Sequence, residues 1–409
     1  MAKNPYKPGV GTRPPYLAGR DEQLRRFRRL LEDYPEKRSN LRVTGLRGVG
    51  KTVLLKEFER MAKREGWVVV RRDLSARLCD EDAFATAIAD HLLDAVEQLS
   101  LLAKLKHRIL SAAQEAIGQI SLDLGGGVTV ALGNPSRSSR SVLEDRLRVA
   151  LNHVGELAQG RGVAFLFDEA HTMHDSPRKG QFPLGALLSA FVAVQDDDDD
   201  PLPVMLVLCG LPPLVANIHR ARSNAERLFK AEQIANLRLE PDDGGLSDAA
   251  LALVRPAHDS GEILFSDAAA EGIARDVDGY PFFIQWFGEA LWDAADFADQ
   301  TEIDVSLYET QRTLVQRALD DEFFEPRYRD ARRADQGTLR VAAALGDERF
   351  EKNAIDAATD KTSGAIAQSL NRLIIDNLLF RDDHGVYAYT APLFGDFVRR
   401  RHPRMTDDV

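Results

Sequence analysis

A short glycine-rich segment carries the residues best suited to chemistry in this chain of 409 residues. It reads Gly45-Leu46-Arg47-Gly48-Val49-Gly50-Lys51-Thr52 and matches the pattern G-x-x-x-x-G-K-[ST]. Its glycines allow backbone N–H groups to turn toward one anion, and a helix that starts here adds its dipole. The lysine adds a positive charge, and the threonine hydroxyl is an oxygen ligand for Mg²⁺. The segment therefore predicts a phosphate cradle.

The flanks of this segment indicate how it is held. Residues 41–44 are an apolar-rich run that predicts a strand, and a helical pattern follows from Lys51 to about Glu65. Gly66 ends that pattern, and 67–70 predict the next strand. A strand, loop, helix and strand in this order predict an α/β fold with a parallel sheet.

A second candidate group stands at the end of another apolar run. Residues 163–167 predict a buried central strand, and Asp168 and Glu169 follow it directly. After a phosphate loop, such an acidic pair is placed to hold Mg²⁺ through the first carboxylate and to polarise the attacking water through the second. His171 and His174 lack further ligands at metal spacing, so we assign them to a polar loop.

The overall composition excludes several classes of protein. The net charge of −11 does not favour nucleic acid or an acidic membrane surface. Cys79 and Cys209 are the only cysteines and form no disulfide framework or metal cluster. No apolar stretch reaches the ~20 residues of a membrane helix, and the N-terminus lacks a signal peptide pattern. We therefore expect a cytoplasmic protein with no membrane contact.

Changes of pattern along the chain predict its domains. These are an extended or disordered arm over 1–16, a core over 17–240, a helical lid over 241–330 and a winged-helix domain over 331–409. Within the core, about 80–140 is expected to be an insertion, with helix followed by a glycine-hinged hairpin at 120–132. The insertion is either a lid or partner-binding element or a plain structural elaboration.

Two further motifs resemble those of a known group of ATPases. The segment Leu17-Ala18-Gly19-Arg20-Asp21-Glu22 resembles the hhGRxxE motif of STAND-type NTPases, and Gly279-Tyr280-Pro281 resembles their GxP motif. The order of motifs, ending in a winged helix, is also similar to origin-recognition-type AAA+ ATPases of bacteria and archaea. The resemblance covers nearly the whole chain and implies that ATP and Mg²⁺ are bound.

Together, the motifs and the resemblance assign roles to individual residues. Lys51 and Glu169 are the expected catalytic residues, and Arg227 joins them by resemblance to arginines that face a nucleotide in cis or from a neighbouring subunit. Thr52 and Asp168 are the expected metal ligands. The expected nucleotide-binding residues are Leu17, Gly19, Arg20, Gly45, Leu46, Arg47, Gly48, Val49, Gly50, Lys51, Thr52, Val53 and Pro281.

Two departures from the resembled families favour slow turnover. Cys209 stands where the initiator-type families place a polar sensor residue, and a thiol hydrogen-bonds weakly. No arginine follows Pro281 in the manner of an AAA+ sensor 2. We therefore predict a slow ATPase switch whose ATP and ADP states control assembly or a protein partner. The alternatives are a DNA-binding initiator or transposition-type AAA+ ATPase, and a nucleotide-binding scaffold with negligible hydrolysis.

The C-terminal residues bear on the DNA-binding alternative. Residues 362–374 predict the recognition helix of a winged helix, but it offers only Gln368, Asn371 and Arg372 for base or phosphate contacts. Phosphate contacts dominate DNA affinity, and acidic residues slightly outnumber basic ones here. The arginines at 399–401 and Arg404 form a basic tail that could touch a DNA backbone or cap the last helix.

Overall fold

The computed structural model describes most of the chain, in two compact units. The described residues are 3–9, 11–34, 37, 39–99, 139–158, 161–196, 202–241, 244–346, 348–381 and 385–404. The first unit comprises Met1–Asp21, Leu46–Val53 and Ile234–Val409, and the second comprises Glu22–Gly45 and Leu54–Gln233.

The second unit is built around a five-stranded sheet in the order β2-β3-β4-β1-β5. Strand β1 pairs in parallel with β4, and β3 pairs in parallel with both β2 and β4. This confirms the predicted α/β fold with a parallel sheet. The strands are β1 (Asn40–Gly45), β2 (Val68–Asp73), β3 (Val163–Asp168), β4 (Val204–Gly210) and β5 (Phe229–Ile234). The last of these was not predicted from the sequence.

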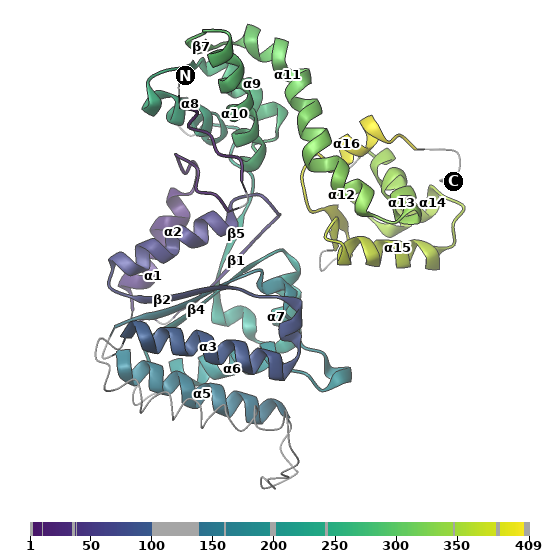
Figure 1. Cartoon of the computed structure of the whole chain (residues 1–409). Helices are drawn as coiled ribbons and strands as arrows, with labels where there is room; N and C mark the ends of the chain where they lie inside the picture. The colour runs from purple at the N-terminus through teal and green to yellow at the C-terminus, as the bar shows by residue number, and fades with distance from the viewer. Residues whose placement is uncertain are drawn as a thin grey trace, which may run out of the picture. The chain divides into compact units, whose positions relative to one another are not determined.

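Helices cover both faces of this sheet, which explains why residues 163–167 of β3 and 204–209 of β4 are apolar throughout. Helices α1 (Asp21–Glu32) and α2 (Lys51–Arg64) lie on one face, and α3 (Glu81–Leu99), α5 (Ser139–Ala158) and α6 (Pro183–Gln195) lie on the other (Figure 1). Every residue of β3 and β4 is buried. On the α1 and α2 side, the rings of Phe27 and Phe58 stack with centroids 4.1 Å apart.

Helix α3 occupies the start of the segment that was expected to be an insertion. Its residues Phe84, Ile88, Leu92 and Ala95 belong to the same hydrophobic core as β2, β3 and β4. This helix is therefore part of the core rather than an element apart from it, because its apolar stripe packs against the sheet. The rest of the expected insertion up to residue 138, including the hairpin at 120–132, lies outside the described residues.

A helical region follows β5 in the first unit. Its helices are α8 (Asp248–Ser260), α9 (Asp267–Asp276), α10 (Pro281–Phe297) and α11 (Val305–Leu319). Ser247, Ser266 and Asp304 cap the N-termini of α8, α9 and α11 by accepting a backbone N–H. Such caps satisfy donors that the first turn of a helix leaves open. The short strands β6 (Leu264–Phe265) and β7 (Glu302–Ile303) pair in parallel.

The C-terminal residues alternate short helices with a small antiparallel sheet. A π-helical turn, η5 (Asp320–Phe324), leads into α12 (Glu325–Asp330). The following elements are α13 (Arg333–Ala344), β8 (Arg349–Phe350), α14 (Lys352–Ala357), α15 (Ser363–Ile375), β9 (Leu379–Arg381), β10 (Tyr387–Tyr389) and α16 (Phe394–Arg401). Strand β10 lies between β8 and β9 and is antiparallel to both. Of the apolar residues Ile366, Leu370, Leu373 and Ile374, which are expected to form a buried stripe, the first three are buried and Ile374 is half-buried.

The N-terminal arm is extended but anchored, which differs from the disorder considered for it. Tyr6 is 2% exposed, and its hydroxyl donates to the carbonyl oxygen of Leu253. Its ring packs edge-on against Phe265 and Trp292, with centroids 5.8 Å and 6.1 Å away. A side chain at Gly288 would overlap this ring. One buried aromatic residue thus holds a segment whose proline and glycine content alone predicts no fixed structure.

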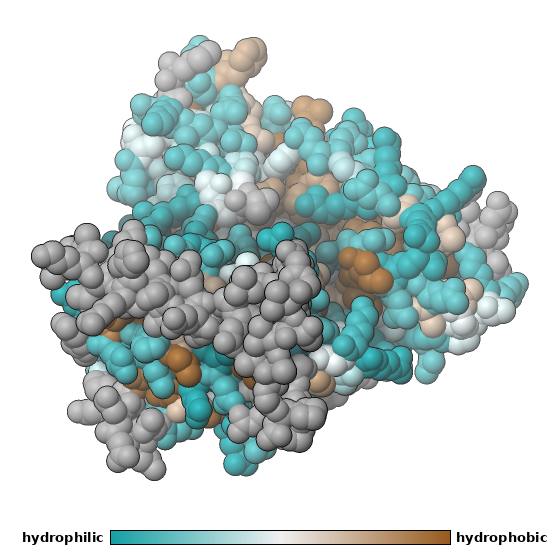
Figure 2. All heavy atoms as spheres, turned by 60° about the horizontal axis from the view of Figure 1, so that its bottom comes forward, coloured by the Kyte–Doolittle hydropathy of each residue, from teal (hydrophilic) through white to brown (hydrophobic). Residues whose placement is uncertain are grey.

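The surface of the molecule is mainly hydrophilic, as expected for a chain in which 29% of the residues are charged. In the space-filling view, hydrophilic residues cover most of the coloured surface, with apolar residues in small groups (Figure 2). Among the described residues, three large apolar side chains are more than half exposed: Phe297 at the end of α10, Leu314 in α11 and Ile375 at the end of α15. Scattered apolar residues of this kind are normal on a folded protein.

Candidate functional site

The glycine-rich loop joins β1 to α2, as its pattern predicts. Gly48 and Gly50 have φ angles of +77° and +94°, a region that favours glycine. Lys51 is the first residue of α2, so the N-terminal N–H groups of that helix stand at the loop. The Lys51 ammonium donates a hydrogen bond to the Leu46 carbonyl oxygen at 2.7 Å. The lysine, although charged, is only 9% exposed, and its side chain folds over the loop.

Arg20 supports this loop from the predicted hhGRxxE-like segment. Its guanidinium donates to the carbonyl oxygens of Val49 at 3.0 Å and Ala235 at 2.7 Å. The residue is 6% exposed, and burial lowers the pKa of Arg20 to about 10, an effect that the charge of Asp248 partly offsets. Arg20 therefore holds the backbone of the loop, while its predicted contact with a nucleotide stays a prediction.

The same segment requires glycine at position 19. Gly19 has a φ angle of +61°, and an added Cβ would lie 2.8 Å from a carboxylate oxygen of Asp248. Asp248 is also held by Arg238, whose Nε lies 2.7 Å from the same carboxylate oxygen. Leu17, the remaining residue expected here, is half-buried. The segment is thus packed against the start of α8, where it carries Arg20 to the loop.

Tyr280 brings the predicted GxP-like segment onto the loop. Pro281 starts α10, where its fixed φ and missing N–H are tolerated. The Tyr280 hydroxyl donates to the carbonyl oxygen of Arg47 at 2.7 Å. Any side chain at Gly48 would overlap the Tyr280 hydroxyl, so glycine is needed there for space as well as for its φ angle. Tyr280 is buried, and this burial raises its pKa, so the hydroxyl stays protonated and able to donate.

Arg47 has a second backbone partner in the C-terminal residues. Its N–H donates to the carbonyl oxygen of Thr390 at 3.3 Å, in the turn between β10 and α16. The Thr390 hydroxyl donates in turn to the carbonyl oxygen of Asn377 at 2.6 Å, which fixes that turn. Sequence reasoning missed both Thr390 and the loop contact of Tyr280. Nothing in the local pattern signals either one, because the partners are far apart along the chain.

The acidic pair lies at the end of β3 in the second unit, as predicted. Asp168 is 2% exposed, and one of its carboxylate oxygens accepts the backbone N–H of Glu169 at 2.9 Å. Glu169 has a φ angle of +52°, which is unusual for a residue other than glycine. Strain of this kind gathers at functional sites. The Glu169 carboxylate lies 3.6 Å from Nδ1 of His171, a histidine predicted to lie in a polar loop.

Asn217 supports the turn after this pair and was also missed by sequence reasoning. It lies in α7 (Pro213–Ala221), and its side-chain amide donates to the carbonyl oxygens of His171 at 2.8 Å and Met173 at 3.2 Å. Asn217 therefore fixes the conformation of the turn that follows the acidic pair.

Cys209, predicted at the sensor position, is fully buried near the end of β4 and pairs in register with Val43.

The predicted catalytic residue Arg227 lies at the surface, and Arg222 lies nearby in the chain. Arg227 is exposed on η4 (Ala225–Leu228), so its catalytic role stays a prediction. Arg222 is engaged with the Ser189 hydroxyl at 3.2 Å. The loop residues 46–53 belong to the first unit and Asp168, Glu169 and Arg227 to the second.

Among the residues that the structure describes, no three His, Cys, Asp or Glu side chains gather in a group that could hold a metal ion. In the same part of the chain, no helix combines the length and apolar character that crossing a membrane requires.

Comparisons with known sequences agree with this geometry for the core. Residues 16–208 match the family described as AAA ATPase domain. Residues 321–398 match a family described as Domain of unknown function (DUF8462). No curated protein matches the chain by sequence.

Comparisons with solved structures concern the fold. The chain is similar to the ORC2 protein of Aeropyrum pernix in its ADP form, at 14% identity over 95% of this chain and 96% of that chain, with a TM-score of 0.50. It also matches the RuvB Holliday junction branch migration motor of Thermotoga maritima, at 13% identity over 91% of this chain and 92% of that chain, with a TM-score of 0.40. Residues 16–208 thus resemble an AAA ATPase domain in sequence, and the fold agrees with the predicted α/β P-loop fold.

Proposed function

We propose that this protein binds ATP with Mg²⁺, hydrolyses it slowly, and uses its nucleotide state as a switch for assembly or for binding a protein partner. The observation that carries the proposal is the conformation of the loop Gly45–Lys51. Gly48 and Gly50 adopt positive φ angles, Lys51 folds over the loop backbone, and the loop runs directly into the N-terminus of α2. This combination is suited to a chain of phosphates.

The residues available also suit a magnesium ion. Mg²⁺ prefers oxygen ligands, and it is usually held by one or two protein oxygens together with phosphates and water. Thr52 would supply its hydroxyl, and the buried carboxylate of Asp168 would supply a second ligand. When bound, the ion would neutralise charge on the phosphates. Glu169 would orient and polarise the attacking water, and Lys51 would bind the phosphate oxygens.

The switch part of the proposal rests on the contacts of Arg47. Its carbonyl oxygen accepts a hydrogen bond from the hydroxyl of Tyr280, the residue before α10. Its N–H donates to the carbonyl oxygen of Thr390, in the turn between β10 and α16. A change in the loop on nucleotide binding would therefore alter contacts with the helical region and the C-terminal residues at once. A ligand shifts such an equilibrium by its differential affinity for the two arrangements.

The domain assignment remains part of this proposal. Helices α8 to α11 support a helical lid over 241–330. Helices α13, α14 and α15 with the antiparallel strands β8, β10 and β9 support a winged helix over 331–409. Such domains serve as protein-contact modules as well as DNA readers, so the fold alone does not decide between these uses.

The DNA-binding alternative receives less support from the side-chain contacts. Arg372, the basic residue of α15, has two N–H groups bonded to the buried carboxylate of Asp335 at 2.6 Å and 2.8 Å. Arg400 and Arg401 of the basic tail are bonded to Asp320 and Asp321. DNA would have to compete with these internal carboxylates for the same guanidinium groups. We therefore place a protein partner, which includes a second copy of this chain, ahead of DNA.

Two substitutions test the proposal directly. Lys51→Ala removes the charge over the loop and should weaken ATP binding at least tenfold, measured by calorimetry with Mg²⁺ present. Glu169→Gln should leave binding intact and lower phosphate release by roughly a hundredfold or more, because general-base catalysis contributes factors of that order. Wild-type ATP affinity in the Lys51→Ala variant would refute the loop assignment.

Three measurements separate the remaining alternatives: phosphate release, DNA affinity and particle mass. If the wild-type protein binds ATP but Glu169→Gln does not change phosphate release, the chain is a nucleotide-binding scaffold without this hydrolytic mechanism. A DNA affinity that falls steeply with added salt would favour the initiator-type alternative. Particle mass measured with ATP and with ADP tests the assembly switch, for which a mass that does not respond to the nucleotide would count against self-assembly.

A further inference from the structure

Arg47 and Arg327 are arginines that the proposed function leaves without a role for their side chains. Arg47 is an exposed residue within the loop, and Arg327 is half-buried in α12. Within the described ranges, neither guanidinium lies within ion-pair distance of a carboxylate. Other arginines of the first unit do have such a partner, as Arg372 has in Asp335 and Arg400 in Asp320.

Arg327 is held in place by the residue one turn before it. Its guanidinium carbon lies 3.7 Å from the centroid of the Phe323 ring. One of its N–H groups donates to the Phe323 carbonyl oxygen. A guanidinium stacked on an aromatic face keeps its edges open for further hydrogen bonds. Arg327 is therefore positioned with donors to spare.

A continuous set of aromatic contacts connects this arginine to the loop. The Phe323 ring packs edge-on against Phe283, with centroids 5.3 Å apart. Phe283 in turn packs edge-on against Tyr280 at 4.4 Å, and the Tyr280 hydroxyl bonds to the Arg47 carbonyl. Arg327 thus belongs to the same packed group as the loop residue Arg47, rather than to a distant surface.

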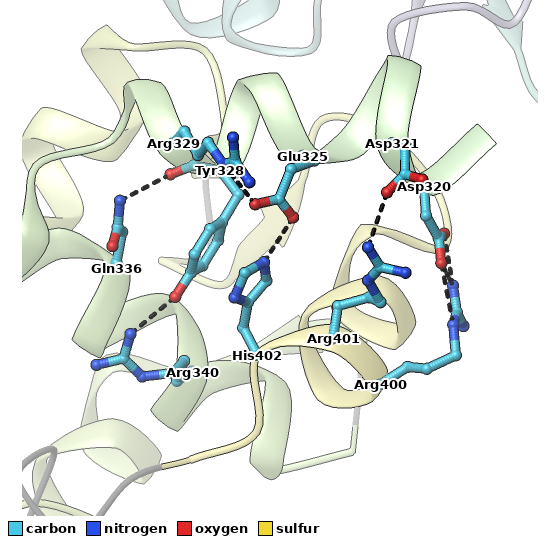
Figure 3. Close-up of polar contacts among 10 residues, drawn as sticks. All are labelled: Asp320, Asp321, Glu325, Tyr328, Arg329, Gln336, Arg340, Arg400, Arg401 and His402. Atoms are coloured by element: carbon cyan, nitrogen blue, oxygen red, sulfur yellow. Dashed lines mark hydrogen bonds and ion pairs between the residues drawn. The ribbon is translucent and has the colours of Figure 1, made fainter. Parts of the chain in front are cut away.

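Helix α12, which carries Arg327, is fixed to α16 by a polar network (Figure 3). Glu325 accepts from Arg329 and lies 2.7 Å from Nε2 of His402. Arg400 makes a bidentate contact with Asp320, a residue only 1% exposed in the π-helical turn. A π-helical turn inside a helix is rare and is often found at functional sites. The network sets the position of α12 relative to α16, which follows the Thr390 turn.

We propose that Arg47 and Arg327 together bind the terminal phosphate of a nucleoside triphosphate on the loop, so that Arg327 reports the nucleotide state to the C-terminal residues. The inference rests on the proposed function of the loop. Arg47 supplies one guanidinium from the loop itself, and Arg327 supplies the second from α12. A diphosphate has no group in the position of the third phosphate, so it would lack this contact.

The charges of Arg47 and Arg327 favour an anion as the ligand of these two side chains. Burial lowers the pKa of Arg327, and the positive charge of Arg47 lowers it further, while Tyr280 and Asp330 act in the opposite direction. Two cations that repel each other, with no carboxylate in contact, are stabilised when a doubly charged phosphate enters between them. Guanidinium groups suit this ligand because their N–H donors match phosphate oxygens in pairs.

The inference predicts a change in nucleotide preference. Arg327→Gln should weaken binding of the non-hydrolysable triphosphate analogue ADPNP, with Mg²⁺, by roughly ten- to a hundredfold, the range expected for lost hydrogen bonds to a charged group. Its ADP affinity should stay within about twofold of the wild type by the same reasoning. Isothermal titration calorimetry of the full chain gives both constants. Arg327→Lys should recover part of the lost ADPNP affinity because it keeps the charge.

A matched variant controls for the loss of one positive charge. Arg317 is an exposed arginine in α11 of the same unit, and Arg317→Gln should leave both affinities unchanged. An unchanged ratio of ADPNP to ADP affinity in Arg327→Gln would overturn the inference. An equal loss of both affinities would also overturn it, since that result indicates a purely structural role. If the wild-type chain binds neither nucleotide, the proposed function itself fails, which is a distinct result.

Discussion

The hydroxyl of Tyr280 lies 2.7 Å from the carbonyl oxygen of Arg47, although 233 positions separate the two residues in the chain. This hydrogen bond connects the N-terminal turn of α10 to the phosphate loop. The same loop residue donates its N–H to Thr390. The loop is therefore held by residues from beyond the matched range 16–208, and its conformation depends on how Tyr280 and Thr390 are packed.

Removing only the Tyr280 hydroxyl should lower the affinity of the loop for ATP. Tyr280→Phe keeps the ring against Phe283 but deletes the donor to Arg47, so ATP affinity should fall about three- to tenfold, as expected for one neutral hydrogen bond. Calorimetry with Mg²⁺ and ATP measures the change. Tyr308→Phe is the matched control, because the buried Tyr308 hydroxyl bonds to Asp276 away from the loop. An equal loss of affinity in both variants would contradict a specific role for Tyr280.

The two neighbouring arginines of α16 should differ in their contribution to stability. Arg400 pairs with Asp320, whose side chain is 2% exposed, whereas Arg401 pairs with Asp321, whose side chain is 58% exposed. Arg400→Met leaves a buried carboxylate without this partner and should lower the free energy of unfolding by roughly 3 kcal/mol. Arg401→Met should cost about 0–1 kcal/mol. Urea denaturation compares the two, and equal losses would show that burial of Asp320 is not decisive.

The Asp335–Arg372 pair should make stability depend on pH in the acid range. Burial by itself would raise the pKa of Asp335, but hydrogen bonds from Arg372 and Ser369 outweigh it, and the pKa lies below the usual 3.8. A carboxyl group with a lowered pKa in the folded state stabilises the fold above its unfolded pKa. That contribution is lost as the pH falls through the folded-state pKa.

The substitution Asp335→Asn measures this contribution. At pH 7 it should lower the free energy of unfolding by roughly 2–4 kcal/mol, because a buried charged hydrogen bond is lost. The difference from wild type should shrink as the pH falls toward about 3. Denaturant titrations at several pH values give the curve. Asp360→Asn, at an exposed residue before α15, should show no such trend, and a pH-independent loss in Asp335→Asn would contradict the argument.

The N-terminal arm should be released when its anchor is removed. Tyr6→Ala vacates the space between Phe265 and Trp292 and should cost about 3–5 kcal/mol, the usual loss for a buried aromatic side chain. Limited trypsin digestion should then cleave after Lys3, whose N–H is bonded to Glu262 at 3.1 Å, faster than in wild type. Tyr16→Ala, at a half-buried tyrosine further along the arm, should change this cleavage much less. Unchanged cleavage after Lys3 in Tyr6→Ala would show that other contacts hold the arm.

Much of the core fold could be predicted from the sequence, because its elements have strong local patterns. The run at 163–167 is apolar throughout, as a strand buried on both faces must be, and it became β3. The apolar-rich run at 41–44 became β1. Strand β5 escaped prediction because it alternates buried and exposed residues weakly. Tyr6 escaped as well, since a single aromatic anchor in a proline-rich arm has no periodic signal.

The sequence by itself determined the chemistry of the candidate site. The spacing of Gly45, Gly50 and Lys51 and the position of Asp168 and Glu169 after a strand are local features, because one loop and one strand end suffice to place them. The tertiary structure alone decided what holds the loop. Arg20, Tyr280 and Thr390 reach it through hydrogen bonds with its backbone. Backbone groups are the same in every residue, so no pattern of side chains along the chain reveals which distant residue will bind them.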